Sequence, residues 1–135
     1  MSVEIKPEYA ERLRTAYHLW FTTVREDGTP QPTPVWFVWQ GDSFLIYSMP
    51  DTQKVKNIRQ NPKVSLSYTA SENAGKFLVI MGHATIDQSG PPLDQVPAYV
   101  EKYAEGIKAL GATPEQMAQG YTTVIRVRPT KVRGA

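Results

Sequence analysis

Six short segments of the chain carry apolar, β-branched and aromatic residues in the patterns that are typical of β-strands. Residues 64–68 alternate strictly between apolar and polar side chains, which predicts a strand with one buried face. Gly82 interrupts the fifth segment and predicts a β-bulge or the close approach of another backbone, while Pro129 suggests an edge or an end in the last one. The six predicted strands span residues 18–25, 32–40, 43–49, 64–68, 76–86 and 122–132.

Helical patterns lie between and around these strands. Proline at position 7 opens a run of good helix formers that continues to residue 17, and Asn61-Pro62 ends a second helix at residues 52–60. Residues 93–110 carry apolar side chains at mixed spacings of three and four, which predicts one long amphipathic helix. Thr113 followed by Gln116 is a capping-box pattern that predicts a further short helix.

The order of these elements predicts a mainly β protein. Turn residues at 26–29 and 41–42 join the first three strands, so we expect an antiparallel meander there. Six strands with short connections and inserted helices indicate a six-stranded antiparallel barrel with peripheral helices, formed as a single domain by residues 1–135. The interior of such a small barrel is filled by side chains. We therefore expect a large cofactor to bind outside it, often between subunits.

Composition narrows the functional classes. Charged residues make up 21% of the chain and hydrophobic ones 41%, and the net charge of +2 does not indicate nucleic-acid binding. The absence of cysteine excludes disulfides, thiolate catalysis and cysteine-based zinc sites, and it fits a reducing compartment. No apolar run is long enough to span a bilayer and the N-terminus has no signal-peptide core, so we expect a cytoplasmic protein without a membrane span.

The segment from Ser48 to Asn61 carries the strongest chemical signal. It leaves an apolar strand and enters a helix, so hydroxyl groups, free backbone N–H groups and two lysines meet in a small volume. A helix N-terminus favours anions, and Lys54 and Lys56 in its first turn are unfavourable unless an anion is bound there. This conflict predicts a phosphate site. The alternative is a basic helix exposed to solvent, because clusters of charged residues usually lie on a solvated surface.

A second unusual segment is the entrance to the predicted strand 32–40. Pro32 and Pro34 remove two backbone donors, which leaves carbonyls and neighbouring N–H groups free for a flat ligand. A simple loop at the barrel rim is the alternative interpretation. The sequence contains no catalytic triad spacing, no P-loop and no Rossmann fingerprint. For His18 and His83 we favour structural roles over metal binding, so we expect no metal site.

The segments around these two features resemble a known family, the flavin-binding split β-barrels of the pyridoxamine 5′-phosphate oxidase-like superfamily. The similarity is greatest to the actinobacterial branch that uses the deazaflavin coenzyme F420. Four segments carry the resemblance, in the order found in the family, within about residues 10–132. They are Leu19-Trp-Phe-Thr-Thr-Val-Arg-Glu-Asp-Gly-Thr-Pro, Pro32-Thr-Pro-Val-Trp-Phe, Lys54-Val-Lys-Asn-Ile-Arg-Gln-Asn-Pro-Lys-Val and Gly82-His-Ala-Thr-Ile.

The resemblance implies a homodimer with active sites at the interface and assigns cofactor-binding roles. The predicted strand that begins at residue 32 would line the flavin or deazaflavin ring, and the segment that follows residue 47 would bind the cofactor phosphate. In this sequence the corresponding residues are Pro32, Thr33, Pro34, Val35 and Trp36 for the ring, and Ser48, Met49, Thr52, Lys54, Lys56 and Asn57 for the phosphate side. Arg126, Arg128 and Lys131 are candidates for contacts to the cofactor tail across the dimer.

The cofactor expectation follows from one departure from the family pattern. FMN-using oxidases usually carry arginine in the strand that corresponds to residues 32–37, and this sequence has none there. We therefore expect reduced F420 as hydride donor to an electron-poor organic small molecule, with FMN as the alternative cofactor. The rival functions are an FMN-dependent oxidase or reductase and a non-enzymatic flavin or haem carrier, with His18 or His83 as axial ligand. No catalytic acid is assigned, although Tyr68 and His83 are candidates.

Overall fold

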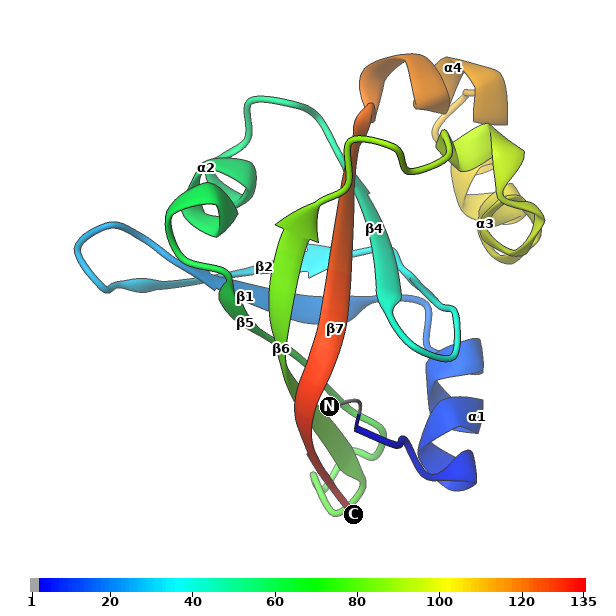
Figure 1. The fold of residues 1–135 in the computed structure, drawn as a ribbon. Coiled ribbons are helices and arrows are strands. Elements are labelled where there is room, and N and C mark those ends of the chain that lie inside the picture. Colours follow the sequence, from blue (N-terminus) through cyan, green and yellow to red (C-terminus); the bar gives the residue numbers. More distant parts are fainter. Residues whose placement is uncertain (1–2) are drawn as a thin grey trace.

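The computed structural model describes residues 3–135 and contains seven antiparallel strands that form one curled sheet, a split barrel (Figure 1). The strand order is β2-β1-β5-β6-β7-β4-β3. The strands are β1 (Leu19–Val24), β2 (Pro30–Val35), β3 (Val38–Trp39), β4 (Phe44–Ser48), β5 (Lys63–Thr69), β6 (Phe77–Ile86) and β7 (Thr123–Gly134). The helices are α1 (Pro7–Thr15), α2 (Gln53–Gln60), the short 3₁₀ helix η1 (Leu93–Gln95), α3 (Pro97–Ala109) and α4 (Pro114–Gly120).

The prediction of six strands is wrong by one, because the segment 32–40 is two strands. Trp36 and Phe37 separate β2 from β3. Strands β2 and β3 form the two opposite edges of the sheet. The backbone N–H of Phe37 donates to Tyr103 Oη of α3, 2.8 Å away, instead of to a neighbouring strand. The chain therefore passes from one edge of the curled sheet to the other at this point. Both hairpins of the predicted meander are present, since β2 pairs with β1 and β3 pairs with β4, but they lie at opposite edges of the sheet and do not form one continuous meander.

Two other local predictions have clear outcomes. Gly82 marks a register shift between β6 and β7, and a side-chain carbon at this position would lie only 2.7 Å from the carbonyl oxygen of Arg128. The predicted helix 93–110 is instead a 3₁₀ turn followed by α3, because the ring of Pro97 is tolerated only at the first turn of a new helix. Pro129 pairs with Gly82 in β7, beyond the last residue that pairs with β4.

The apolar residues form two cores on opposite sides of β4. All five residues of this strand are buried, which explains its unbroken apolar sequence. Phe44 and Ile46 face the barrel interior with Phe21, while Leu45 and Tyr47 face the second core beneath η1, α3 and α4. Helix α1 closes one end of the barrel, and α2 packs on β1 and β6. The α3–α4 pair therefore covers the outside of the barrel next to the β2–β3 junction.

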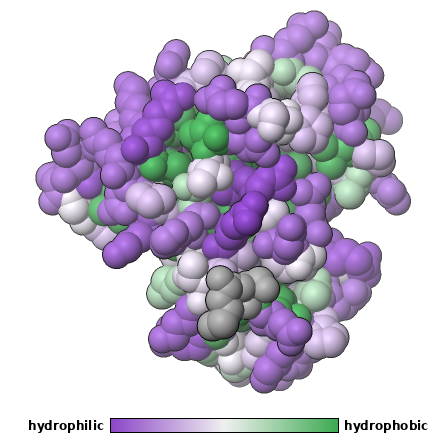
Figure 2. Space-filling view, in the orientation of Figure 1, coloured by the Kyte–Doolittle hydropathy of each residue, from purple (hydrophilic) through white to green (hydrophobic). Residues whose placement is uncertain are grey.

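The edge strand β2 carries three prolines at alternating positions. Pro30, Pro32 and Pro34 are exposed, while the residues between them are partly buried and face the barrel. Every residue of β2 still has a partner on β1, so the donors that proline lacks lie on the free edge of the strand. No helix in residues 3–135 is long and apolar enough to cross a membrane. Figure 2 shows mostly hydrophilic residues on one face of the molecule, with hydrophobic ones gathered in small separate areas.

Candidate functional site

A cavity of about 270 Å³ lies where the end of β2, strand β4, the first turn of α2 and the α3–α4 pair meet. The cavity opens to solvent, and its wall is mainly aromatic and apolar with one lysine. Its lining residues are Pro34, Val35, Trp36, Tyr47, Lys54, Tyr99, Leu110, Met117 and Tyr121. The cavity thus brings the proline-rich strand and the helix-start lysine together, although about twenty residues separate them in the sequence.

Trp36 is fixed in one orientation by α3. Its ring stacks on Tyr103 at 4.5 Å between centroids and 6° between planes. The Tyr103 hydroxyl accepts from the Phe37 N–H and lies 2.7 Å from the carbonyl oxygen of Tyr17, to which it donates. Gly106 allows α3 to approach this closely, because a Cβ there would collide with Tyr17 Oη and lie 3.0 Å from the Trp36 ring. Trp36 therefore offers a rigid aromatic edge to the cavity.

Lys54 is the cation of this cavity. It is half buried, and within residues 3–135 it forms no hydrogen bond or ion pair through its side chain. Burial lowers the pKa of Lys54 below its ordinary value, which means that its charged form is incompletely solvated. An amine in this state gains from any anion that enters the cavity.

The start of α2 is also open to an anion. Thr52 is the N-cap residue, yet its side chain makes no capping hydrogen bond, and the first turn holds no acidic residue. Ser48 Oγ lies 2.9 Å from Thr52 Oγ1 and donates to the Met49 carbonyl at 2.8 Å. The first-turn N–H groups have no partner within the helix, so this end carries a partial positive charge next to Lys54.

Lys56 and Asn57 face a different direction. Lys56 is exposed and lies with Gln53 and Asn57 in an open hollow beside the β1–β2 turn. Asn57 is buried, and its Nδ2 donates to Thr23 Oγ1 at 2.9 Å and to Gln31 Oε1 at 3.2 Å. Its Oδ1 accepts from Gln53. The Nδ2 end of the Asn57 amide therefore holds α2 on the β1–β2 hairpin, while its oxygen is used within α2.

The basic residues of β7 have different surroundings from one another. Arg126 forms an ion pair with Asp87 at 3.0 Å, and its guanidinium also donates to Gln40 and Ser43. Arg128 and Lys131 are exposed and pair in the ladder with His83 and Met81. Arg126 is thus occupied within its own chain.

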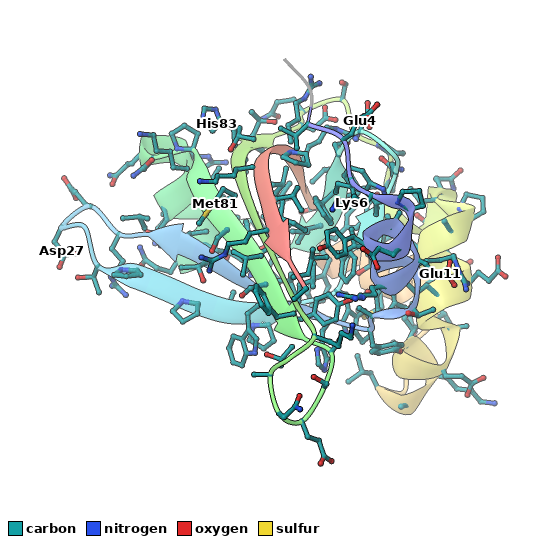
Figure 3. The ribbon with its side chains drawn as sticks, turned by 90° about the horizontal axis from the view of Figure 1, so that it is seen from below. Glu4, Lys6, Glu11, Asp27, Met81 and His83 are labelled. Carbon is teal, nitrogen blue, oxygen red and sulfur yellow. The ribbon has the colours of Figure 1, made fainter. Side chains whose placement is uncertain are left out.

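The two proposed proton donors lie apart from the cavity. Tyr68 packs against the barrel core, and its hydroxyl is enclosed without a hydrogen-bond partner in residues 3–135. His83 is exposed on β6 beside Met81, and both side chains are labelled in Figure 3. His18 is exposed before β1. In the described part of the chain, no three His, Asp or Glu side chains gather as a metal site would require.

The outer face of the sheet opposite the barrel core carries large exposed apolar side chains. Trp20 on β1 is 50% exposed and Met81 on β6 is 46% exposed. Between them lie the small side chains of Ser65 and Ser67 on β5, which pair with Met81 and Trp20 respectively. This face therefore combines two large exposed apolar side chains with small polar ones between them.

The sequence matches the family described as pyridoxamine 5′-phosphate oxidase over residues 5–135. The chain belongs to this family. It is thus a member of a family of flavin-binding oxidoreductases with the split-barrel fold.

Solved structures of this family's fold include proteins of several kinds. An F420 reductase is 27% identical, with 96% of this chain and 98% of that chain covered and a TM-score of 0.73. A conserved hypothetical protein of Mycobacterium tuberculosis is 21% identical over 98% and 85%, with a TM-score of 0.78. A haem storage protein of Vibrio cholerae is 17% identical over 98% and 95%, with a TM-score of 0.68. No protein of curated function matches the sequence.

Sequence reasoning missed the α3–α4 side of the cavity. Tyr99, Met117 and Tyr121 line it together with Leu110 at the end of α3. The apolar spacing in this region predicted only a helix packed on the core. The same spacing occurs whether the apolar side chains fill a core or line a cavity, so it does not distinguish the two. Strand β2 ends next to α3 because the chain crosses there from one edge of the sheet to the other. No local sequence pattern predicts this crossing.

Proposed function

We propose that this family member is an F420-dependent reductase that transfers a hydride from the reduced deazaflavin to an electron-poor organic substrate. The observation that carries the proposal is the half-buried Lys54 at the uncapped start of α2, on the wall of the same cavity as Trp36. Its side chain has no partner within residues 3–135. A cation, free helix N–H groups and a flat aromatic wall are the features that a phosphate-bearing ring cofactor needs.

The residues present fit such a cofactor. Lys54 and the N–H groups that follow Thr52 would hold the phosphate, with Ser48 and Thr52 as hydroxyl partners. Pro34, Val35 and Trp36 would border the ring. When bound, the deazaflavin supplies the hydride, so the chain itself has to bind, orient and keep water away from the reacting face.

The choice of F420 over FMN rests on the missing arginine. Strand β2 has no guanidinium that could clamp the dianionic phosphate of FMN in a bidentate way, and lysine does not reproduce that geometry. The phosphodiester and oligoglutamate tail of F420 spread their charge, which suits separate cations such as Lys54 and the exposed Arg128 and Lys131. The 27% identical F420 reductase supports this choice.

We further propose that the protein acts as a homodimer through the outer sheet face around Trp20 and Met81. Burying such a surface against a second copy removes large apolar side chains from water, and two-fold pairing of one patch is the commonest form of oligomer. The exposed Arg128 and Lys131 border this face, where they could meet the cofactor tail of the partner subunit.

The experiment is a titration of the purified protein with F420, FMN and haem, followed by fluorescence and absorbance. We expect F420 to bind more tightly than FMN, and haem to give no stoichiometric Soret band. Equal affinities, or FMN that copurifies at one per subunit, would reject the F420 assignment and leave the fold unaffected. A stoichiometric Soret band would favour the haem carrier instead.

A further inference from the structure

A second cavity lies between α1, β3 and α3, and α1 and α3 are neighbours at one side of the molecule (Figure 1). Its volume of about 410 Å³ is within the range of roughly 300–1,000 Å³ that is usual for small-molecule sites. Ala98, Glu101 and Lys102 line it from α3, and their spacing of three and four residues places them on one face of the helix. This cavity shares no lining residue with the one that contains Lys54.

Lys102 is the cation of this second cavity, and its partners are all uncharged. Its Nζ donates to the carbonyl oxygens of Leu13, at 3.2 Å, and Phe37, at 3.3 Å. The same atom lies 3.8 Å from the centroid of the Phe37 ring and 5.4 Å from that of Tyr103. Within residues 3–135 no carboxylate forms an ion pair with it. Lys102 is therefore a half-buried cation whose charge no protein group neutralises.

The other charged groups at this cavity do not change that balance. Arg14 of α1 is exposed, and its guanidinium is paired with Glu11 of the same helix. Glu101 is exposed and directly precedes Lys102 in α3, where successive side chains do not face each other. Strand β3 contributes no charged group to the wall. Solvent screens the two exposed groups, so Lys102 dominates the electrostatics of the enclosed part.

The protonation of Lys102 depends on what the cavity holds. Burial lowers the pKa of Lys102 to about 8, because its charged form is incompletely solvated. The amine is still mainly charged at pH 7. A negative group beside it would favour the charged form, so an anion that enters the cavity gains from the interaction.

The wall next to Lys102 is flat and apolar. Trp39 is partly buried, and its ring packs against Phe44 at 4.7 Å between centroids, which limits its movement. Leu13 and Val38 are buried and extend this wall. A flat ligand body can lie against such a surface. The single uncompensated lysine matches one negative charge on the ligand.

We propose that the cavity between α1, β3 and α3 is a second binding site, which takes a small aromatic carboxylate with its carboxylate group beside Lys102 and its ring against Trp39. The site is independent of the proposed reductase function, because none of its residues lines the cavity assigned to F420.

A matched pair of ligands and a matched pair of variants test the assignment. The anion 2-naphthoate and the uncharged 2-naphthamide share one ring system, and isothermal titration at pH 7 should show tighter binding of the anion. Lys102→Met should weaken naphthoate binding by about ten- to a hundredfold, the value of a charge-assisted contact, and abolish the preference. Lys108→Met removes the same charge from an exposed position of α3 outside both cavities and should keep the preference.

A variant that leaves Lys102 in place gives an independent test, because Lys102→Met also removes the donor to two carbonyls. Ala98 is exposed on the wall of the cavity, so Ala98→Phe should fill it and prevent naphthoate binding. Ala104→Phe introduces the same side chain at an exposed position of α3 outside the cavity and should bind as the wild type does. Lys54→Ala should also bind naphthoate normally. Loss of binding in Lys54→Ala would place the ligand in the other cavity and overturn the proposal.

The pH dependence of the wild-type protein provides a test without substitutions. Since the pKa of Lys102 is about 8, raising the pH from 7 to 9 should weaken naphthoate binding several-fold and leave binding of the amide unchanged. Absence of saturable naphthoate binding, equal binding of acid and amide at pH 7, or unchanged affinity in both Lys102→Met and Ala98→Phe would overturn the proposal.

Discussion

Lys54 is the residue on which the cofactor site depends. If it holds the phosphate, Lys54→Ala should remove a charge-assisted hydrogen bond worth about 1.5–3 kcal/mol, which weakens F420 binding by roughly ten- to a hundredfold. The free protein should be as stable as before or slightly more stable, because Lys54 is a half-buried cation at a helix N-terminus without its anion. Isothermal titration and urea unfolding measure the two effects.

Lys56 provides the matched control for this variant. It lies on the same helix two residues away, but it is exposed beside the β1–β2 turn and does not line the cavity. Lys56→Ala changes the net charge equally and should alter F420 affinity much less than Lys54→Ala. Equal losses from both variants would indicate a diffuse charge effect, and no loss from either would remove the phosphate site.

The ion pair between Asp87 and Arg126 should give a pH-dependent contribution to stability. The hydrogen bond from Arg126, followed by that from Ser89, lowers the pKa of the Asp87 carboxyl. A lowered folded-state pKa means that the contribution is complete above the ordinary aspartate pKa and is lost as the pH falls through the folded value. Asp87→Asn should therefore cost about 0.5–1 kcal/mol at pH 7 and progressively less in acid. Urea unfolding at pH 7 and pH 3 tests this, and an equal cost at both values would contradict it.

The elements show where local sequence patterns were sufficient. Residues 64–68 alternate strictly and lie within β5, and the predicted capping box of α4 is present, with Thr113 and Gln116 bonded reciprocally. The bulge at Gly82 followed from glycine in a strand. These features depend on neighbouring residues, so a single sequence encodes them.

The division of segment 32–40 could not be predicted in this way. Its apolar run is continuous, and only the distant hydroxyl of Tyr103 accepts the N–H of Phe37 and separates β2 from β3. The site shows the same limit. The pairing of Lys54 with Trp36 followed from family resemblance, whereas Tyr99 and Tyr121 reached the cavity through tertiary packing that no spacing reveals.

The close approach of α3 to Trp36 can be tested through Gly106. Gly106→Ala introduces a methyl group that would collide with Tyr17 Oη and press on the Trp36 ring at 3.0 Å. We expect a loss of about 1–2 kcal/mol in the free energy of unfolding, since overpacking outweighs the gain of about 1 kcal/mol in helix propensity. Urea unfolding measures the change.

Gly120 in α4 is the control for the same substitution. A Cβ there meets no atom within 4 Å, so Gly120→Ala should be neutral or slightly stabilising. If the two alanine variants are equally stable, the packing of α3 on Trp36 is looser than the structure describes.

At the scale of the whole molecule, the outer sheet face should determine the oligomeric state. Trp20 is 50% exposed at the centre of the proposed dimer contact, so Trp20→Glu would place a charge in an apolar interface and should yield a monomer. Light scattering at micromolar concentration distinguishes the two states. Leu110→Glu is the control, because Leu110 is 64% exposed at the end of α3 and should leave the dimer intact. A wild-type protein that is monomeric would reject the interface.

The prolines of β2 have a consequence for how this protein meets other chains. Open sheets are prone to aggregation because unpaired edge strands recruit further strands into fibrils. Here the edge at β2 lacks amide donors at Pro30, Pro32 and Pro34, and the opposite edge, β3, is only two residues long. Both edges are therefore poor templates for a growing ladder, so copies of this chain can associate through side chains on the sheet face with little amyloid-like addition at its borders.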